Sequence, residues 1–119
     1  MADLTIQKVV EAGLKATYAA ATAGGDAVLN VRGDVVLHVK NAAAGSKTVT
    51  VTAQTTSKAV KGMGSMTKAN IVAVIPAGED WFIGPFSAEA YNDANGKAQI
   101  TYDDVTSVTI AALEIKRAE

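Results

Sequence analysis

The chain has 119 residues, a formal net charge of −1 and no cysteine. This length suits one domain with its own core, and the lack of cysteine excludes a disulfide scaffold and thiolate metal sites. The near-balanced charge argues against a dedicated nucleic-acid or membrane binder. No apolar run approaches the roughly 18 residues of a membrane span, and the first residues lack the pattern of a signal peptide, so we expect a soluble protein made without a standard leader.

The first residues predict a short amphipathic segment followed by a flexible one. Apolar side chains recur there with the i, i+3, i+4 spacing of one or two helical turns. These residues are Ile6, Val9, Val10 and Leu14. Gly13 can end such a helix in the left-handed conformation, and Ala16–Gly25 is small and flexible in composition. Because so short a helix is marginal alone, we predict an extended or short-helical arm, Met1–Ala23, that becomes ordered by packing on something else, followed by one domain over residues 24–119.

From Val35 to Thr52, apolar and polar residues alternate along two runs joined by a turn of small residues. That period buries one face of a strand, and Val and Thr favour such a half-buried, pleated surface. Similar runs continue to the end of the chain. We predict strands at Ala27–Val31, Val35–Lys40, Lys47–Gln54, Asn70–Ile75, Trp81–Phe86, Lys97–Tyr102 and Ser107–Ile115.

Turn signals separate the predicted strands. Thr55–Lys68 is polar and glycine-rich, which indicates a long loop, and Ile75–Gly78 is typical of a turn. Asn95-Gly96 predicts a hairpin with a type I′ turn. Several short strands at roughly regular spacing, with no βαβ rhythm, predict an all-β fold, a sandwich or a barrel.

Charge is unevenly distributed along the chain. Met1–Asp34 carries −1, Val35–Gly78 carries +5 and Glu79–Glu119 carries −5. Two interpretations are open. Either the three stretches mix on the folded surface, or a basic patch docks on an acidic neighbour, such as another copy of the chain.

No part of the sequence has the form of a catalytic site. His38 is the single histidine, and no cysteine or second histidine can partner it. Asp34 shares its strand face but lies too far along the strand, so we expect His38 to face solvent or to cap a sheet edge. Without an acid–base pair or a set of metal ligands, the sequence predicts a protein that is not an enzyme and uses no cofactor or metal.

Aromatic and methionine side chains are candidates for contact with partners. Trp81 and Phe82 face opposite ways on a predicted strand. We expect Phe82 and Phe86 in the core, whereas Trp81 fits either the core or a partly exposed interface anchor. Met63 and Met66 lie in the glycine-rich loop, which suits either an adaptable contact surface or a loop folded back over the sandwich.

The order of several short motifs resembles that of a known family. In chain order they are Gly13-Leu14-Lys15-Ala16-Thr17-Tyr18, Val39-Lys40-Asn41, Thr48-Val49-Thr50-Val51, Pro76-Ala77-Gly78-Glu79, Ile83-Gly84-Pro85-Phe86, Tyr91-Asn92-Asp93 and Val105-Thr106-Ser107-Val108-Thr109-Ile110-Ala111-Ala112. Together they span most of the chain and resemble the small head decoration (cement) proteins of tailed bacteriophages and prophages.

The resemblance implies a two-sheet, jelly-roll-like β-sandwich without enzymatic activity, made in the host cytoplasm and placed on the capsid exterior of a virion. It also implies homotrimers that brace neighbouring major capsid subunits. The family's contact residues vary, so the candidate partner-binding residues come from this sequence alone. They are Ile6, Val9, Val10, Leu14, Tyr18, Lys58, Lys61, Met63, Met66, Lys68 and Trp81.

Two alternatives stay open. A tail- or baseplate-associated sandwich cannot be separated from a head protein by sequence. A carbohydrate- or host-surface-binding module would use the same fold, but it would display several exposed aromatic residues, and this chain offers one candidate, Trp81.

Overall fold

Strands form where the sequence alternates or runs apolar, and they pack into two sheets. The computed structural model describes residues 2–30, 33–54, 57–60, 62, 64–67 and 69–114. The elements are β1 (Ala2–Asp3), β2 (Ile6–Lys8), β3 (Ala19–Ala20), β4 (Asp26–Leu29), β5 (Val35–Asn41), β6 (Lys47–Val51), β7 (Ser57–Val60), β8 (Gly64–Thr67), β9 (Ile71–Ile75), β10 (Asp80–Ile83), α1 (Ala88–Tyr91), β11 (Lys97–Tyr102) and β12 (Val108–Glu114). The predicted all-β class is confirmed.

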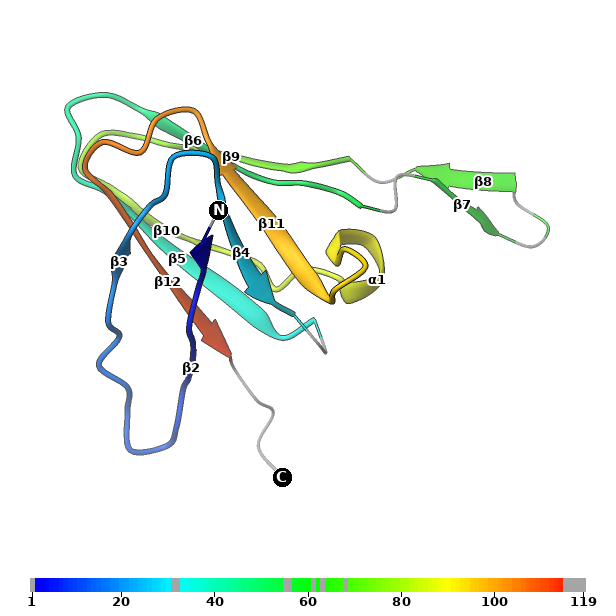
Figure 1. Cartoon of the computed structure of the whole chain (residues 1–119), viewed down its shortest axis with the longest axis horizontal. Helices are drawn as coiled ribbons and strands as arrows, with labels where there is room; N and C mark the ends of the chain where they lie inside the picture. Colours follow the sequence, from blue (N-terminus) through cyan, green and yellow to red (C-terminus); the bar gives the residue numbers. More distant parts are fainter. Residues whose placement is uncertain are drawn as a thin grey trace.

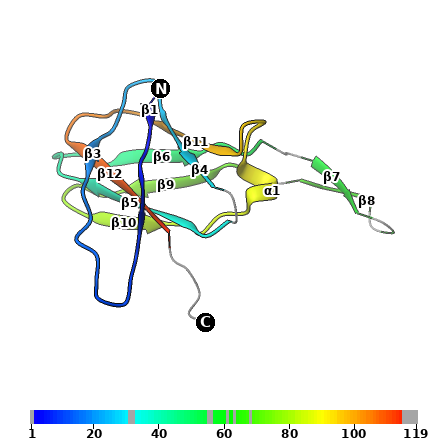
Figure 2. The ribbon, with the colours of Figure 1, turned by 60° about the horizontal axis from the view of Figure 1, so that its bottom comes forward.

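The two sheets have the nested strand pairing of a jelly roll. The first sheet has the order β1-β4-β11-β6-β9, and the second has β10-β5-β12-β2, with β3 also paired to β12. β4 pairs antiparallel with β11, β5 with β10 and β6 with β9, so each pair lies inside the previous one along the chain and alternates between sheets. Figures 1 and 2 show the two layers. The chain is a two-sheet, jelly-roll-like β-sandwich.

The core lies between the inner faces of the sheets. Leu37 and Val39 of β5, Val49 and Val51 of β6 and Ile100 of β11 are at most 1% exposed. The two on β5 and the two on β6 are two residues apart, as the alternation predicts. Full burial of such a side chain contributes about 1.5–3 kcal/mol relative to leaving it in water. The apolar residues of the alternating pattern therefore form the buried core that stabilises the sandwich.

Each of the seven predicted strands has a counterpart, β4, β5, β6, β9, β10, β11 and β12, although the ends shift by a few residues. β6 is the most shortened, since it stops at Val51 rather than Gln54. Its ladder ends because the Ala53 N–H donates to the side-chain oxygen of Asn70, at 2.8 Å, instead of to a neighbouring strand.

The prediction of a long loop over Thr55–Lys68 is wrong. β7 and β8 form a separate antiparallel hairpin, in which Ser57 is opposite Thr67 and Val60 is opposite Gly64. The hairpin extends away from the sandwich beyond β6 and β9 (Figure 1). Local antiparallel pairing satisfies the backbone of a segment that is too polar for the core.

The two predicted turns have different outcomes. Glu79 N–H donates to Pro76 O at 3.2 Å, and Gly78 has a φ of +75°, which confirms the turn after β9. The type I′ turn at Asn95-Gly96 is wrong, because Gly96 has a positive φ and Asn95 does not. Asp93 organises this turn instead: its Oδ1 accepts the Asn95 N–H at 2.8 Å, and its backbone oxygen accepts the Gly96 N–H.

Candidate functional site: the arm and the sheet face beside it

The N-terminal arm, described over residues 2–23, is extended and joins both sheets of the sandwich. β1 pairs parallel with β4 in the first sheet, and β2 pairs parallel with β12 in the second. Of the two conformations expected for the arm, extended and short-helical, the structure has the extended one. Pairing with strand edges gives backbone partners to residues 2–3, 6–8 and 19–20, whereas a helix of one or two turns is marginal in water.

Residues between β2 and β3 form a lobe that projects from the sandwich (Figures 1 and 2). Two hydrogen bonds brace its base: Gln7 Nε2 donates to Thr17 O at 2.7 Å, and the Thr17 N–H donates to Gln7 Oε1 at 2.8 Å. At the tip, Gly13 has a φ of +100° and its N–H donates to Val10 O, which turns the chain back.

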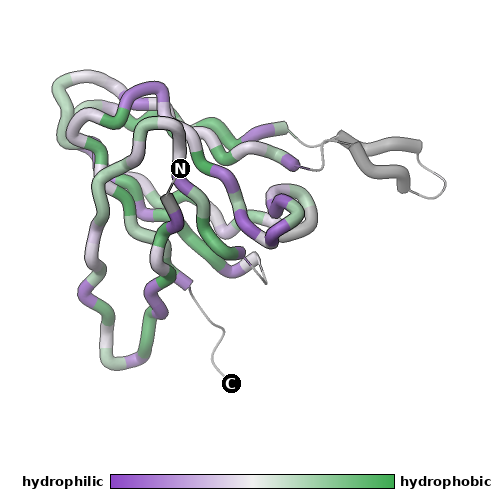
Figure 3. The backbone as a smooth tube through the Cα atoms, viewed as in Figure 1, coloured by the Kyte–Doolittle hydropathy of each residue, from purple (hydrophilic) through white to green (hydrophobic). Residues whose placement is uncertain are grey.

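The tip of the lobe carries exposed apolar side chains beside the charged residues Glu11 and Lys15. Val9, Val10 and Leu14 are 41%, 54% and 38% exposed, and apolar stretches flank the turn (Figure 3). We call these three residues the lobe tip. Exposed apolar groups gathered on a braced projection are typical of an interaction site rather than of a solvated loop.

Behind the lobe, the outer face of the second sheet carries a polar and aromatic cluster. His38 is 7% exposed, and its two ring nitrogens lie 2.5 Å from the Tyr18 hydroxyl and 2.7 Å from Asp80 Oδ2. Phe82 stacks on the imidazole, with ring centroids 4.1 Å apart and an interplanar angle of 9°. A ring that carries its proton on Nε2 fits both partners, because it donates to Asp80 and accepts from Tyr18.

Strand register brings this cluster together. Phe82, His38 and Ala111 are direct neighbours across β10, β5 and β12, and Tyr18 immediately precedes β3, which pairs with β12 at the next positions. The small side chain of Ala111 lets Tyr18 reach across β12 to His38. Lys40 Nζ lies 4.0 Å from the centroid of the Tyr18 ring, a cation–π contact. Tyr18 therefore fastens the arm to the sheet face.

The expectation that His38 faces solvent or caps a sheet edge is wrong. It lies on β5, between β10 and β12, and is covered by side chains from the arm and from β10. Alternation correctly places it opposite Leu37 and Val39, but its partners are 20 and 42 residues away along the chain. No local signal in the sequence links such positions.

The aromatic residues in β10 and just after it only partly follow expectation. Phe86 is buried, as predicted, at 3% exposed, but Phe82 is 64% exposed, so its predicted core position is wrong. Phe82 shares the outer face with His38, where stacking covers one side of its ring. Trp81 is 39% exposed and its Nε1–H donates to Glu79 Oε1 at 3.0 Å, so it is a partly exposed residue of the sheet edge.

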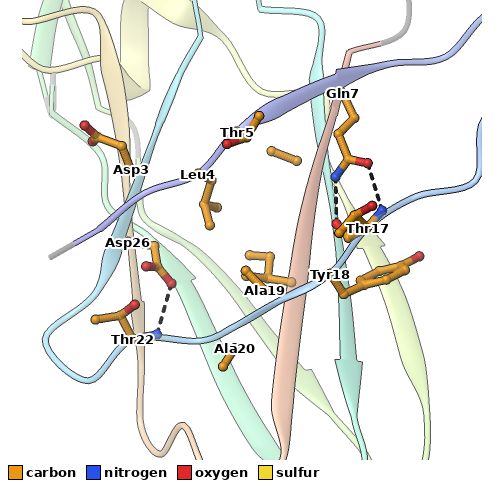
Figure 4. A pocket seen from close by; sticks show the side chains of 12 residues that line it. Asp3, Leu4, Thr5, Gln7, Thr17, Tyr18, Ala19, Ala20, Thr22 and Asp26 are labelled. Carbon is orange, nitrogen blue, oxygen red and sulfur yellow. Dashed lines mark hydrogen bonds between the residues drawn. The ribbon is translucent and has the colours of Figure 1, made fainter.

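A pocket of about 400 Å³ lies between the arm and the sandwich. Figure 4 shows Leu4 and Ala19 on its walls and Asp26 beside Thr22. Asp26 is fully buried, and its Oδ2 accepts the Tyr102 hydroxyl at 2.7 Å and the Thr22 N–H at 3.2 Å. Burial, and then the hydrogen bond to Asp26 and its charge, raise the pKa of Tyr102 well above its usual value of 10. This pair anchors the end of the arm.

The remaining predicted contact residues lie elsewhere in the fold or outside the described residues. Ile6 is half-buried against the core. Lys58 on β7 lies opposite Met66 on β8 in the separate hairpin, whereas Lys61, Met63 and Lys68 lie outside the described residues.

The described part of the chain has neither a cluster of metal ligands nor a membrane-spanning helix. No three His, Cys, Asp or Glu residues gather in a way that could hold a metal ion. No helix there is long and apolar enough to cross a membrane.

Comparison with protein-family models, with curated proteins and with solved structures finds no match for this chain.

Proposed function

We propose that this protein is a non-enzymatic structural protein of a tailed-bacteriophage virion, which binds the outside of the capsid and stabilises contacts between major capsid subunits. The observation that carries the proposal is the lobe tip, where Val9, Val10 and Leu14 are exposed on a projection braced by Gln7 and Thr17. The order of the sequence motifs supplies the choice of partner.

A braced lobe suits a clamp better than a mobile tail does. Apolar surface removed from water contributes roughly 25 cal/mol per Å², and a lobe that is already folded loses less conformational entropy when it binds. Many copies on a symmetric shell act together, so modest individual contacts suffice. The Tyr18–His38 contact holds the base of the lobe at a fixed position on the sandwich.

We also propose that copies form a homotrimer on the capsid, with the basic Val35–Gly78 stretch of one copy facing the acidic Glu79–Glu119 stretch of the next. The basis is the charge distribution, +5 against −5, together with the family resemblance. Exposed pairs contribute only about 0–1 kcal/mol each and are screened by salt, so charge would orient the copies more than hold them.

A sugar-binding module is the candidate from another class, and Phe82 is the feature that favours it, being 64% exposed with one ring face open. Its neighbour Trp81 points to the other side of the strand. The two rings therefore cannot form one stacking platform, which makes capsid binding the better supported function.

The proposal is tested by binding to empty capsids assembled from the major capsid protein encoded with this chain. The double variant Val10→Asp/Leu14→Asp places charge at the lobe tip without touching the core, and we expect at least a tenfold loss of binding in co-sedimentation. Leu29→Asp is the control, since Leu29 is 43% exposed at the end of β4, where it lies opposite Lys97 of β11 and not against an arm strand.

The two variants separate the outcomes. If the lobe-tip variant binds as well as the wild type, the lobe is not the clamp. If the wild type does not bind capsids but labels tails in electron micrographs of virions, the protein is a tail component. Deletion of residues 1–23 is less informative, because it would also remove β1, β2 and β3 from the sheets.

A further inference from the structure

Strand β9 is an edge strand without the usual protection against pairing with another chain. It is the last strand of the first sheet, and among the described residues only β6 pairs with it. Exposed edges normally carry charged residues that prevent association. No charged residue occurs from Ala69 to Gly78. By contrast β10, the edge of the second sheet on this side, begins with the exposed Asp80 and is preceded by the exposed Glu79.

The outward side chains of β9 are exposed valines. Val72 is 60% exposed and Val74 is 51% exposed, on the outer face of the sheet. Their neighbours on β6 are Thr50 and Thr48, so this part of the face is neutral and half apolar. Two valines beside an open edge add apolar area to any strand that pairs there.

The sequence of β9 is a palindrome, Ile71-Val72-Ala73-Val74-Ile75. When two copies pair antiparallel about a two-fold axis at Ala73, each residue meets one of its own kind: Val72 lies opposite Val74, Ile71 opposite Ile75 and Ala73 opposite Ala73. In a two-fold contact a residue of one copy meets its counterpart position on the other, so like charges at Val72 and Val74 would repel each other across the axis. A neutral, palindromic strand avoids this repulsion.

The backbone N–H and C=O groups of β9 also point in the directions that such a pairing requires. On the side of β6 that faces β11, Thr48 O accepts the Asp103 N–H, and the Thr52 N–H donates to Gln99 O. Because antiparallel strands alternate the direction of these groups, Val49 of β6 faces β9, and its partner Ala73 faces back toward β6. The N–H and C=O groups of Val72 and Val74 are thereby left at the open edge.

From these observations we infer that β9 is a homodimerisation edge: two copies pair β9 to β9, antiparallel and centred on Ala73, and join their first sheets into one continuous sheet. The pairing forms four backbone hydrogen bonds, two between each Val72 and the opposing Val74, and gathers four valines on the outer face. Pro76 directly follows β9 and cannot donate to a ladder, which confines the pairing to Ile71–Ile75. The pair is closed, because each copy uses up the same edge. The contact does not depend on capsid binding.

Charged variants of the full-length protein test the contact by sedimentation equilibrium. We expect the mass of the wild type to double as its concentration rises. Neither Val72→Lys/Val74→Lys nor Val72→Glu/Val74→Glu should show this doubling, because like charges cluster across the axis. Mixing the two variants should restore it, since Lys then meets Glu. Leu29→Lys is the control and should sediment like the wild type. If the proposed trimer forms as well, a charged variant should still have half the mass of the wild-type assembly.

Single cysteines test the register, since the chain contains none of its own. Ala73→Cys places two thiols at a non-hydrogen-bonded pair, where Cα atoms are about 4.5 Å apart and a disulfide fits. Val72→Cys places them on a diagonal, about 7–8 Å apart, which a disulfide does not normally span. We expect the first variant to cross-link under mild oxidation and the second, more exposed one not to.

Three results would overturn the inference. One is a wild type whose mass equals that of both charged variants at every concentration. Another is a mixture of the Lys and Glu variants that does not associate. The third is cross-linking at position 72 but not at 73. An edge that instead accepts an extended segment of a capsid protein would give the first result.

Discussion

Replacing Tyr18 with phenylalanine tests how the arm is held on the sandwich. The variant keeps the aromatic ring that lies under Lys40 but removes the hydroxyl that lies 2.5 Å from His38 Nδ1. Since His38 is only 7% exposed, water does not readily replace the lost partner. Leaving a buried polar atom unpaired costs about 1–3 kcal/mol, which corresponds to roughly a five- to 150-fold rise in opening of the arm.

Native-state hydrogen exchange measures this opening directly. The Thr17 and Ala21 amides report on the arm, because they donate to Gln7 Oε1 and to Val108 O. The Thr52 amide reports on the sandwich, because it donates to Gln99 O between β6 and β11. We expect faster exchange at the two arm amides and little change at Thr52, since the core is untouched and parts of a protein can open separately.

A double-mutant cycle with His38→Leu supplies the control. In that background the hydroxyl has no ring nitrogen to bond, so Tyr18→Phe should change arm exchange very little. Equal effects of Tyr18→Phe in both backgrounds would refute the reasoning, because the hydroxyl would then act through another group. Equal acceleration at Thr17 and Thr52 would show that the arm and the sandwich open as one unit.

Two further predictions concern turns and backbone strain. Hydrogen bonds from Gln99, Lys97 and Asn95 lower the pKa of Asp93 below its usual 3.8, so the charged form is favoured in the folded state. The wild type should therefore have a higher thermal midpoint than Asp93→Asn. This difference should be constant above about pH 4 and should shrink as the pH falls from there. An advantage that grows with acid would contradict this assignment. Gly24 and Gly25 both have positive φ, of +93° and +104°, but a Cβ at Gly25 would lie 2.7 Å from Ile100 O, whereas one at Gly24 meets nothing within 4 Å. Both alanine variants should therefore lose about 1–3 kcal/mol to backbone strain, and urea unfolding should show a larger loss for Gly25→Ala; equal losses would mean that the chain shifts to relieve the contact.

The sequence by itself determined the strands of the sandwich and their inward faces. Alternation of apolar and polar residues is a local property, so Leu37 and Val39 could be assigned to the core without knowledge of the fold. The turn after β9 follows in the same way from Pro76 and Gly78, whose backbone preferences do not depend on distant neighbours. The motif order suggested the jelly roll that the nested pairing then confirmed.

Tertiary structure alone decided where the arm lies and what surrounds His38. A few apolar residues at helical spacing favour a helix only weakly, and the open edges of β4 and β12 outweigh that preference by pairing with Ala2–Asp3 and Ile6–Lys8. Phe82 is exposed because strand register places it beside His38 on the outer face, although its hydrophobicity alone predicts burial. Contacts between residues 20 to 42 positions apart depend on which strands become neighbours. That choice is made by the packing of the whole sandwich and not by any local run of residues.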